Sequence, residues 1–293
     1  MIVGRGEKIF RVVNNCFMVL LMLITLYPLL YVLFASLSDP VEFGKVTGLL
    51  WKPAGFSTRG YEAVLNSANI WLGFRNTIFY VVVGTACSMG ITILGAYPLS
   101  RKGFLLKKPI MLFIIFTMFF SGGLVPWYLM CSKFFKFNNH IYSLILPCLF
   151  SVWNMIIAKS FMKGIPFELT EAAKVDGAGD FYIFWKIILP TAKPLIATIG
   201  LFTALTYWND WYNCMLFMST GGTWNLQYTL QNILNSSEAL KRIAAMTGMQ
   251  VGQVPTEGLK LAMTVIATGP IILLYPFLQK YFVKGISIGA VKG

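Results

Sequence analysis

One short cluster in the second half of the chain combines aromatic rings with amide and carboxylate groups. Its members are Trp208, Asn209, Asp210, Trp211, Tyr212 and Asn213. At helical spacing, Trp208, Trp211 and Tyr212 share one face, while Asn209 and Asn213 share another. The C–H faces of a sugar stack on rings, and its hydroxyls form hydrogen bonds with amides and carboxylates. The cluster therefore predicts a binding path for a carbohydrate.

Asp210 stands within an otherwise apolar run. A carboxylate at this depth costs about 2.5–3.5 kcal/mol on insertion scales, so it should face a helix bundle interior or water. An interfacial aromatic belt is an alternative for the rings, but belt aromatics need no Asp or Asn beside them. Asp210 itself has three other possible roles: capping a neighbouring helix, pairing with Arg75, or relaying protons.

A polar segment, residues 164–194, carries four of the eleven acidic residues. Pro166 suits the first turn of a helix, and Gly177 interrupts the helix-forming run that follows. A second short helix is expected from Asp180, as its cap, to residue 188, before the next proline. An amphipathic helix on a membrane surface without a partner is the alternative. It does not explain the glycine turn and the prolines together.

Enzymatic chemistry is not expected. No Gly-x4-Gly-Lys-Ser/Thr sequence occurs, so the chain has no recognisable site for ATP. The single histidine, His140, has no partner for a catalytic or zinc site and is expected in a short exposed loop. The 5 cysteines contain no CxxC pair and are expected to be small apolar filler. We expect no cofactor and no metal in this chain.

The composition is that of a membrane protein. Of 293 residues, 57% are hydrophobic and 12% are charged, and the mean hydropathy is +0.68. Soluble domains have about 25% charged residues. The net charge of +13 comes from basic residues spread between apolar runs, which indicates membrane orientation rather than nucleic acid binding.

The elements that must position these clusters are membrane-spanning helices. We expect an all-α integral membrane protein with six spans, since each needs about 20 residues. A surface helix is expected within 57–68 and a weak helix within 226–240. Residues 1–72 form an N-terminal transmembrane helix with the first external loop, and 73–293 form a five-helix core. The expected spans are 12–38, 76–100, 109–132, 137–158, 194–218 and 261–279.

The distribution of Lys and Arg gives an orientation. Arg101, Lys102, Lys107 and Lys108 form a tight basic cluster between the second and third spans. Most of the 24 basic residues lie on the inner side if both termini are in the cytoplasm. Segment 164–194, between spans 4 and 5, is then also cytoplasmic. This is a multi-pass arrangement.

Two motifs carry a resemblance to a known family. Glu171-Ala172-Ala173 and Asp176-Gly177-Ala178, followed by Phe184, Leu189-Pro190 and Pro194, resemble the EAA loop of the membrane subunits of bacterial ABC importers. Trp208-Asn209 with the aromatic that follows is similar to the span-5 signature of maltose-type carbohydrate permeases. Residues 121–126 resemble the group that takes up complex oligosaccharides, and residues 280–293 resemble the subfamily's C-terminus, where Lys284 and Lys292 would approach the ATPase dimer.

The resemblance implies a transmembrane subunit of a type I ABC importer in the bacterial plasma membrane. In that family the loop forms coupling helices that dock on an ATPase subunit. Glu171 and Asp176 would make docking contacts, and Gly177 would permit the bend. The coupling residues implied are Glu168, Glu171, Ala172, Ala173, Asp176, Gly177, Ala178 and Phe184.

The same resemblance implies partners. They are a second permease subunit, as a heterodimer, two ATPase subunits that bind ATP and Mg, an extracytoplasmic solute-binding protein and an oligosaccharide substrate. Two alternatives stay open: an ABC permease for another solute, such as an amino acid, and an ion-coupled secondary transporter. The second would leave the EAA-like loop unexplained.

Overall fold

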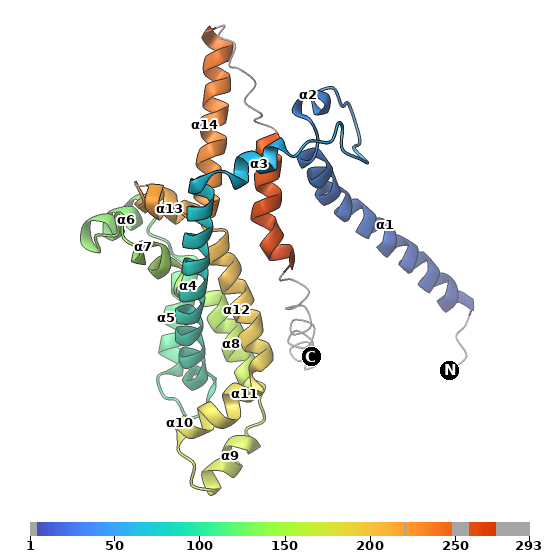
Figure 1. Ribbon diagram of the computed structural model, residues 1–293. Helices are drawn as coiled ribbons and strands as arrows, with labels where there is room; N and C mark the ends of the chain where they lie inside the picture. Colours follow the sequence, from blue (N-terminus) through green and yellow to red (C-terminus); the bar gives the residue numbers. More distant parts are fainter. Residues whose placement is uncertain (1–4, 220, 248–257, 274–293) are drawn as a thin grey trace. The chain divides into compact units, whose positions relative to one another are not determined.

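The computed structural model describes residues 5–219, 221–247 and 258–273. The regular elements in these ranges are helices, joined by turns and one isolated bridge between Ser38 and Phe56. The chain divides into two compact units. Figure 1 colours the chain by position, from blue at the N-terminus to red at the C-terminus. Unit 1 comprises Met1–Ala68 and Asn232–Gly269, and unit 2 comprises Asn69–Gln231 and Pro270–Gly293.

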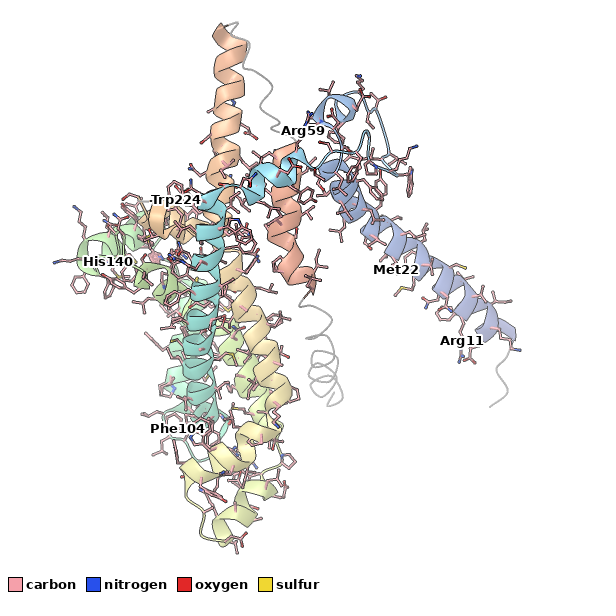
Figure 2. All side chains as sticks on the ribbon, viewed as in Figure 1. Arg11, Met22, Arg59, Phe104, His140 and Trp224 are labelled. Atoms are coloured by element: carbon pink, nitrogen blue, oxygen red, sulfur yellow. The ribbon has the colours of Figure 1, made fainter. Side chains whose placement is uncertain are left out.

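Unit 1 begins with α1 (Arg5–Ser36), which confirms a helix at the first expected span. Its most apolar stretch is not buried by the other described residues of unit 1, and side chains such as Met22 project from the helix (Figure 2). Such a helix, apolar on every side, is suited to lipid. Near its end, the Tyr27 ring lies 5.1 Å from the Trp51 ring.

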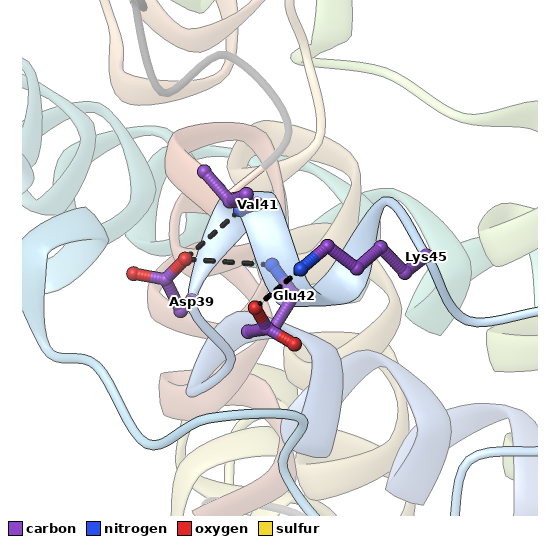
Figure 3. A network of polar contacts seen from close by, with 4 residues as sticks. All are labelled: Asp39, Val41, Glu42 and Lys45. Carbon is purple, nitrogen blue, oxygen red and sulfur yellow. Dashed lines mark hydrogen bonds and ion pairs between the residues drawn. The ribbon is translucent and has the colours of Figure 1, made fainter.

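The loop after α1 is held by local polar contacts. Asp39 caps α2 (Pro40–Phe43) by accepting from the backbone N–H of Val41 at 2.9 Å (Figure 3). Lys45 Nζ lies 2.7 Å from a carboxylate oxygen of Glu42. The expected surface helix appears as α3 (Arg59–Leu65).

The end of the chain is described in part. α14 (Leu226–Thr247) is longer than the helix expected at 226–240. A further apolar helix, Gly258–Leu273, covers most of the expected sixth span. Residues 274–279 of that span and the tail with Lys284 and Lys292 lie outside the described residues.

Unit 2 is a bundle whose four main helices run side by side (Figure 1). They share one core, to which α4 gives Ile93, Ala96 and Leu99. Met155 of α8 and Leu195 of α12 lie in the same cluster. The four helices are α4 (Ala68–Ser100), α5 (Lys107–Phe119), α8 (Val152–Lys163) and α12 (Lys193–Trp208).

The expected third and fourth spans are bent rather than straight, which corrects the prediction. Lys107–Phe119 and Leu124–Phe134 meet at 113°, and Tyr142–Cys148 and Val152–Lys163 meet at 51°. The first break falls at Gly123, whose φ of 87° no helix allows. The second falls before Ser151, whose hydroxyl accepts from the N–H of Asn154 and starts α8 anew. The short pieces are α6 (Leu124–Leu129), η1 (Met130–Phe134), α7 (Tyr142–Ile145) and η2 (Leu146–Cys148).

Two of the described helices, α1 and α4, are long and apolar enough to cross a membrane alone. The number rises to five if each bent pair counts as one span. The all-helical class is therefore confirmed, while six spans with both termini inside stays a prediction. The five cysteines are free, and His140 is exposed in the loop before α7 (Figure 2).

The crossing of α4 and α12 depends on a glycine. A Cβ at Gly84 would overlap the ring of Tyr207, whereas a Cβ at Gly90 of the same helix would meet nothing within 4 Å. We expect Gly84→Ala to lower stability by about 1–3 kcal/mol, because the ring must leave its place against the backbone. Gly90→Ala is the matched control and should change little. Thermal unfolding of the purified protein in detergent measures both, and equal midpoints would contradict this close approach.

Candidate functional site

The polar segment folds into two helical arms joined by a tight turn. The first arm is α9 (Glu168–Val175), with Glu168 and Glu171 in its first turn, where carboxylates favour the helix dipole. Pro166 lies just before this helix rather than in its first turn. The Asp210 cluster lies at the opposite end of unit 2, where α6, α7 and α13 gather (Figure 1).

Gly177 makes the turn between the arms. Its φ is 78°, in the left-handed region that favours glycine. The N–H of Ala178 donates to the Ala173 carbonyl at 2.9 Å, and the N–H of Gly177 donates to the Lys174 carbonyl at 3.0 Å. These two bonds form a Schellman motif, which satisfies the last carbonyls of α9. The predicted bend at Gly177 is confirmed.

The second arm differs from the prediction in two respects. Asp180 is not the cap: Gly179 holds that position, and the Asp180 carboxylate pairs with Lys174 Nζ at 3.0 Å. The helical path also does not stop before Pro190. A π-type turn places Pro190 in the first turn of the next segment, where its missing N–H costs nothing. The segments are α10 (Asp180–Ile183), η3 (Phe184–Ile188) and α11 (Leu189–Thr191).

The loop has a buried inner face. Ala173 and Phe184, at 8% and 4% exposed, belong to the same core cluster as α4, α8 and α12. Thr170 of α9 is also buried. The two arms are therefore packed onto the end of the bundle.

The outer face combines charge with apolar surface. Glu168, Glu171, Ala172, Asp176 and Gly177 are exposed, and Ala178 is half-buried. Among the described residues, Glu168, Glu171 and Asp176 form no ion pair. Sequence reasoning missed three apolar side chains on this face: Val175, Phe181 and Tyr182, at 88%, 72% and 57% exposed. The signal for Val175 and Phe181 was a large apolar residue directly beside an acidic one, and Tyr182 had no such signal.

The aromatic and polar cluster lies at a break, not on a continuous helix. α12 ends at Trp208, and α13 (Tyr212–Phe217) begins after three intervening residues. The shared helical faces predicted for the cluster are therefore wrong. The physical reason is Asp210, whose carboxylate accepts from the backbone N–H of Asn213 at 3.1 Å and from Asn213 Nδ2 at 3.0 Å. Asp210 directly precedes Trp211, the N-cap residue of α13, and its carboxylate caps a free N–H in the first turn of that helix.

A second asparagine closes this break. Asn225 donates through its side-chain amide to the Asp210 carbonyl, and its Oδ1 accepts from the N–H of Tyr228 at 2.9 Å. Asn213 Nδ2 also lies 3.6 Å from Cys148 Sγ. Asn225 and Cys148 were not predicted, since nothing local in the sequence connects them to Asp210. Arg75 is exposed, and the structure describes no ion pair between it and Asp210.

The remaining members of the cluster divide into buried and accessible groups. Trp208 is 9% exposed, and its ring lies 6.1 Å from that of Phe74. Trp211 and Tyr212 are each 39% exposed and meet edge to face at 5.7 Å. Asn209 is exposed, and its Nδ2 donates to the Leu205 carbonyl at 2.9 Å. Two rings and one amide are thus available to a ligand.

Unit 2 thus combines a broken helix beside an aromatic surface with an acidic two-arm loop at its far end. Residues 88–288 match the family of the binding-protein-dependent transport system inner membrane component. The chain belongs to this family. Its members are membrane permease subunits of transporters and are not enzymes themselves.

Relatives match along nearly the whole length. The polygalacturonan/rhamnogalacturonan transport system permease protein YtcP of Bacillus subtilis (strain 168) is 37% identical, covering 98% of this chain and 99% of that protein. Protein LplC of the same organism is 36% identical, covering 99% and 97%. A solved structure of a bacterial ABC transporter that imports the acidic polysaccharide alginate has a chain with a TM-score of 0.82, 27% identity and coverage of 96% and 99%.

The capping role of Asp210 has a direct test. Asp210→Asn keeps a side-chain acceptor for the Asn213 N–H, so stability and uptake should remain close to wild type. Asp210→Ala removes the cap and should cost about 0.5–2 kcal/mol. Thermal unfolding and uptake in proteoliposomes measure both variants. Loss of uptake in a stable Asp210→Asn protein would instead indicate that the carboxylate carries protons.

Proposed function

We propose that this chain is the permease subunit of an ATP-driven importer that carries oligosaccharides across the bacterial plasma membrane. It would act with a second permease subunit as a heterodimer, two ATPase subunits and an extracytoplasmic solute-binding protein. Both termini and the loop 164–194 would lie in the cytoplasm, and six spans would cross the membrane. The observation that carries the proposal is the two-arm loop, exposed on one face and buried in the bundle core on the other.

The exposed face of the loop fits a basic, partly apolar cleft on an ATPase. Glu171 and Asp176 would pair with basic groups there, while Val175 and Phe181 would contribute apolar contact area. Ala172 lets the partner approach the helix backbone closely. Gly177 keeps the second arm at the angle that the docking surface requires.

The coupling would be mechanical. ATP and Mg would be held by the partner subunits, because this chain has no phosphate-binding loop. Closure of the ATPase dimer would push on Glu168 to Phe184, and the buried residues Ala173 and Phe184 would pass the displacement into the bundle. Rocking of the two permease subunits would then change the side on which the sugar path is open.

The cargo is proposed to be an acidic oligosaccharide. Trp211 and Tyr212 present ring faces and Asn209 an amide, whereas Trp208, Asp210 and Asn213 hold the break in shape. Asp210 is the only acidic residue of Asn69–Gln231 outside the loop 164–194. Lys133 and Lys136 are exposed in the segment whose Cys131 and Phe137 pack against Phe217 of α13, so the charge of this end suits an anionic sugar. The relatives named for polygalacturonan and alginate transport support the same cargo class.

The rival proposals have less support. An ion-coupled secondary transporter would use Asp210 as a proton relay, but this carboxylate is engaged in a cap, and the family is one of binding-protein-dependent systems. An amino-acid permease of the same architecture would not need a paired Trp and Tyr at the break. Neither explains the loop and the aromatic surface together.

The docking role of the loop is tested in the reconstituted complex. We expect Glu171→Ala and Gly177→Pro to assemble in the membrane yet lose about tenfold in ATPase stimulation by loaded binding protein, because a docking charge or the turn geometry is gone. Glu62→Ala in α3 and Gly179→Ala serve as controls, since Gly179 has a φ of −69° and open space around it. Full stimulation and transport in both test variants would sink the coupling role of 164–194.

The sugar path has a separate test. Trp211→Ala should raise the apparent KM for uptake of galacturonate oligomers about tenfold, since one stacking surface is removed. Trp51→Ala, an exposed tryptophan of unit 1, is the control. Uptake of radiolabelled oligomers into proteoliposomes gives KM and kcat. An unchanged KM in both variants would place the sugar contacts elsewhere.

A further inference from the structure

One arginine at the end of α4 reaches beneath the loop 164–194. Arg101 follows directly after the last residue of α4, and its Nη1 donates to Thr170 Oγ1 at 3.1 Å. Thr170 is 2% exposed and lies on the inner face of α9. A single hydrogen bond, largely shielded from water, therefore joins a membrane-spanning helix to the first arm of the loop.

The same side chain is connected to the second arm through a ring. The Arg101 guanidinium carbon lies 4.5 Å from the ring centroid of Tyr97, one turn earlier on α4. The Tyr97 ring lies 4.9 Å from the ring of Phe184, which is buried in the second arm. Arg101 and Tyr97 together link the end of α4 with both arms.

Arginine at this position lowers the stability of the fold. Its Nε and Nη2 are buried and have no acceptor among the residues that the structure describes. Buried donors without partners destabilise a fold, and a methionine would fill the space without that penalty. Buried polar groups that lack a partner, and so lower stability, are expected at functional sites. The contact with Thr170 therefore points to a role beyond stability.

Near its other end, α4 is hydrogen-bonded to the segment that follows α13. Asn76 Nδ2 donates to the Trp224 carbonyl at 2.9 Å, and Thr77 Oγ1 accepts from the N–H of Leu226 at 2.8 Å. Trp224 and Leu226 belong to the segment that Asn225 ties to Asp210. One continuous helix thus connects the loop with the break that bears Trp211 and Tyr212.

We propose that Arg101 is the positioning residue through which movement of α9 is transmitted to α4. The inference rests on the proposed coupling function. Its hydrogen bond to Thr170 holds α9 at a fixed position against the end of α4. The contact of Tyr97 with Phe184 makes the second arm move with α4. When α9 is displaced, α4 moves with it as a rod and carries the displacement to the sugar path. Without the bond, the ATPase would still dock, but α4 would follow its closure less completely, through the buried contacts of Ala173 and Phe184.

The test separates docking from transmission. The variants are Arg101→Met and the isosteric Thr170→Val, which remove the donor and the acceptor respectively. Thr170→Ser keeps the hydroxyl, and Lys108→Met removes an exposed cation from the same basic cluster. Each complex is reconstituted, and three quantities are measured with galacturonate oligomers: ATPase subunits retained, stimulated ATP hydrolysis, and sugar transported. The decisive readout is the number of ATP molecules hydrolysed per sugar.

Arg101→Met and Thr170→Val should retain the ATPase and its stimulation while using about fivefold more ATP per sugar. The double variant should be no worse than the poorer single one, and both controls should match wild type. A wild-type ratio in Thr170→Val, or loss of the ATPase from it, would overturn the inference, even if Arg101→Met failed to assemble. These results are distinct from failure of the proposed function, in which the wild-type complex itself would show no stimulated hydrolysis.

Discussion

Inside a bilayer every backbone N–H and C=O must find a partner within the protein, and this constraint shapes each break in the helices of unit 2. At the break between α12 and α13, the Asp210 carboxylate, the Asp210 carbonyl and two asparagines satisfy one another. At the start of α8, the Ser151 hydroxyl takes the free N–H of Asn154. The breaks are therefore built positions with fixed geometry. They leave the Trp211 and Tyr212 side chains partly exposed at the break between α12 and α13.

The two ends of unit 2 are chemically distinct. One end presents acidic and apolar side chains on the arms around Gly177, and the other presents rings and basic residues. Between them the bundle is held by apolar contacts and by the close approach of Gly84 to Tyr207. A stiff core of this kind transmits displacement, because close-packed interiors change between discrete arrangements instead of deforming continuously. The separation of the two ends by rigid helices is thus the basis of the proposed coupling.

Much of this could be predicted from the sequence, and for identifiable reasons. Runs without charge indicated helices, and the first and second came where expected. Gly177 could be predicted as a turn because few other residues adopt its φ. The bends at Gly123 and Ser151 could not, since hydropathy measures apolar length and not direction. Capping by Asp210 could be named as one possible role but not chosen, because a carboxylate beside aromatics is equally compatible with binding and with capping. Its partner Asn225 is 15 residues away in sequence and could not be predicted.

The first helix behaves differently from the bundle. α1 is a continuous helix that satisfies its own backbone, and its most apolar stretch is not covered by the other described residues of unit 1. Such a helix can be stable in a bilayer by itself, in contrast to α4, whose Gly84 and Gly95 closely approach Tyr207 of α12 and Met155 of α8. In the order of synthesis, α1 can enter the membrane as it emerges from the ribosome and hold the nascent chain there while the later, broken helices gather. An independently stable helix thus precedes a cooperative assembly step.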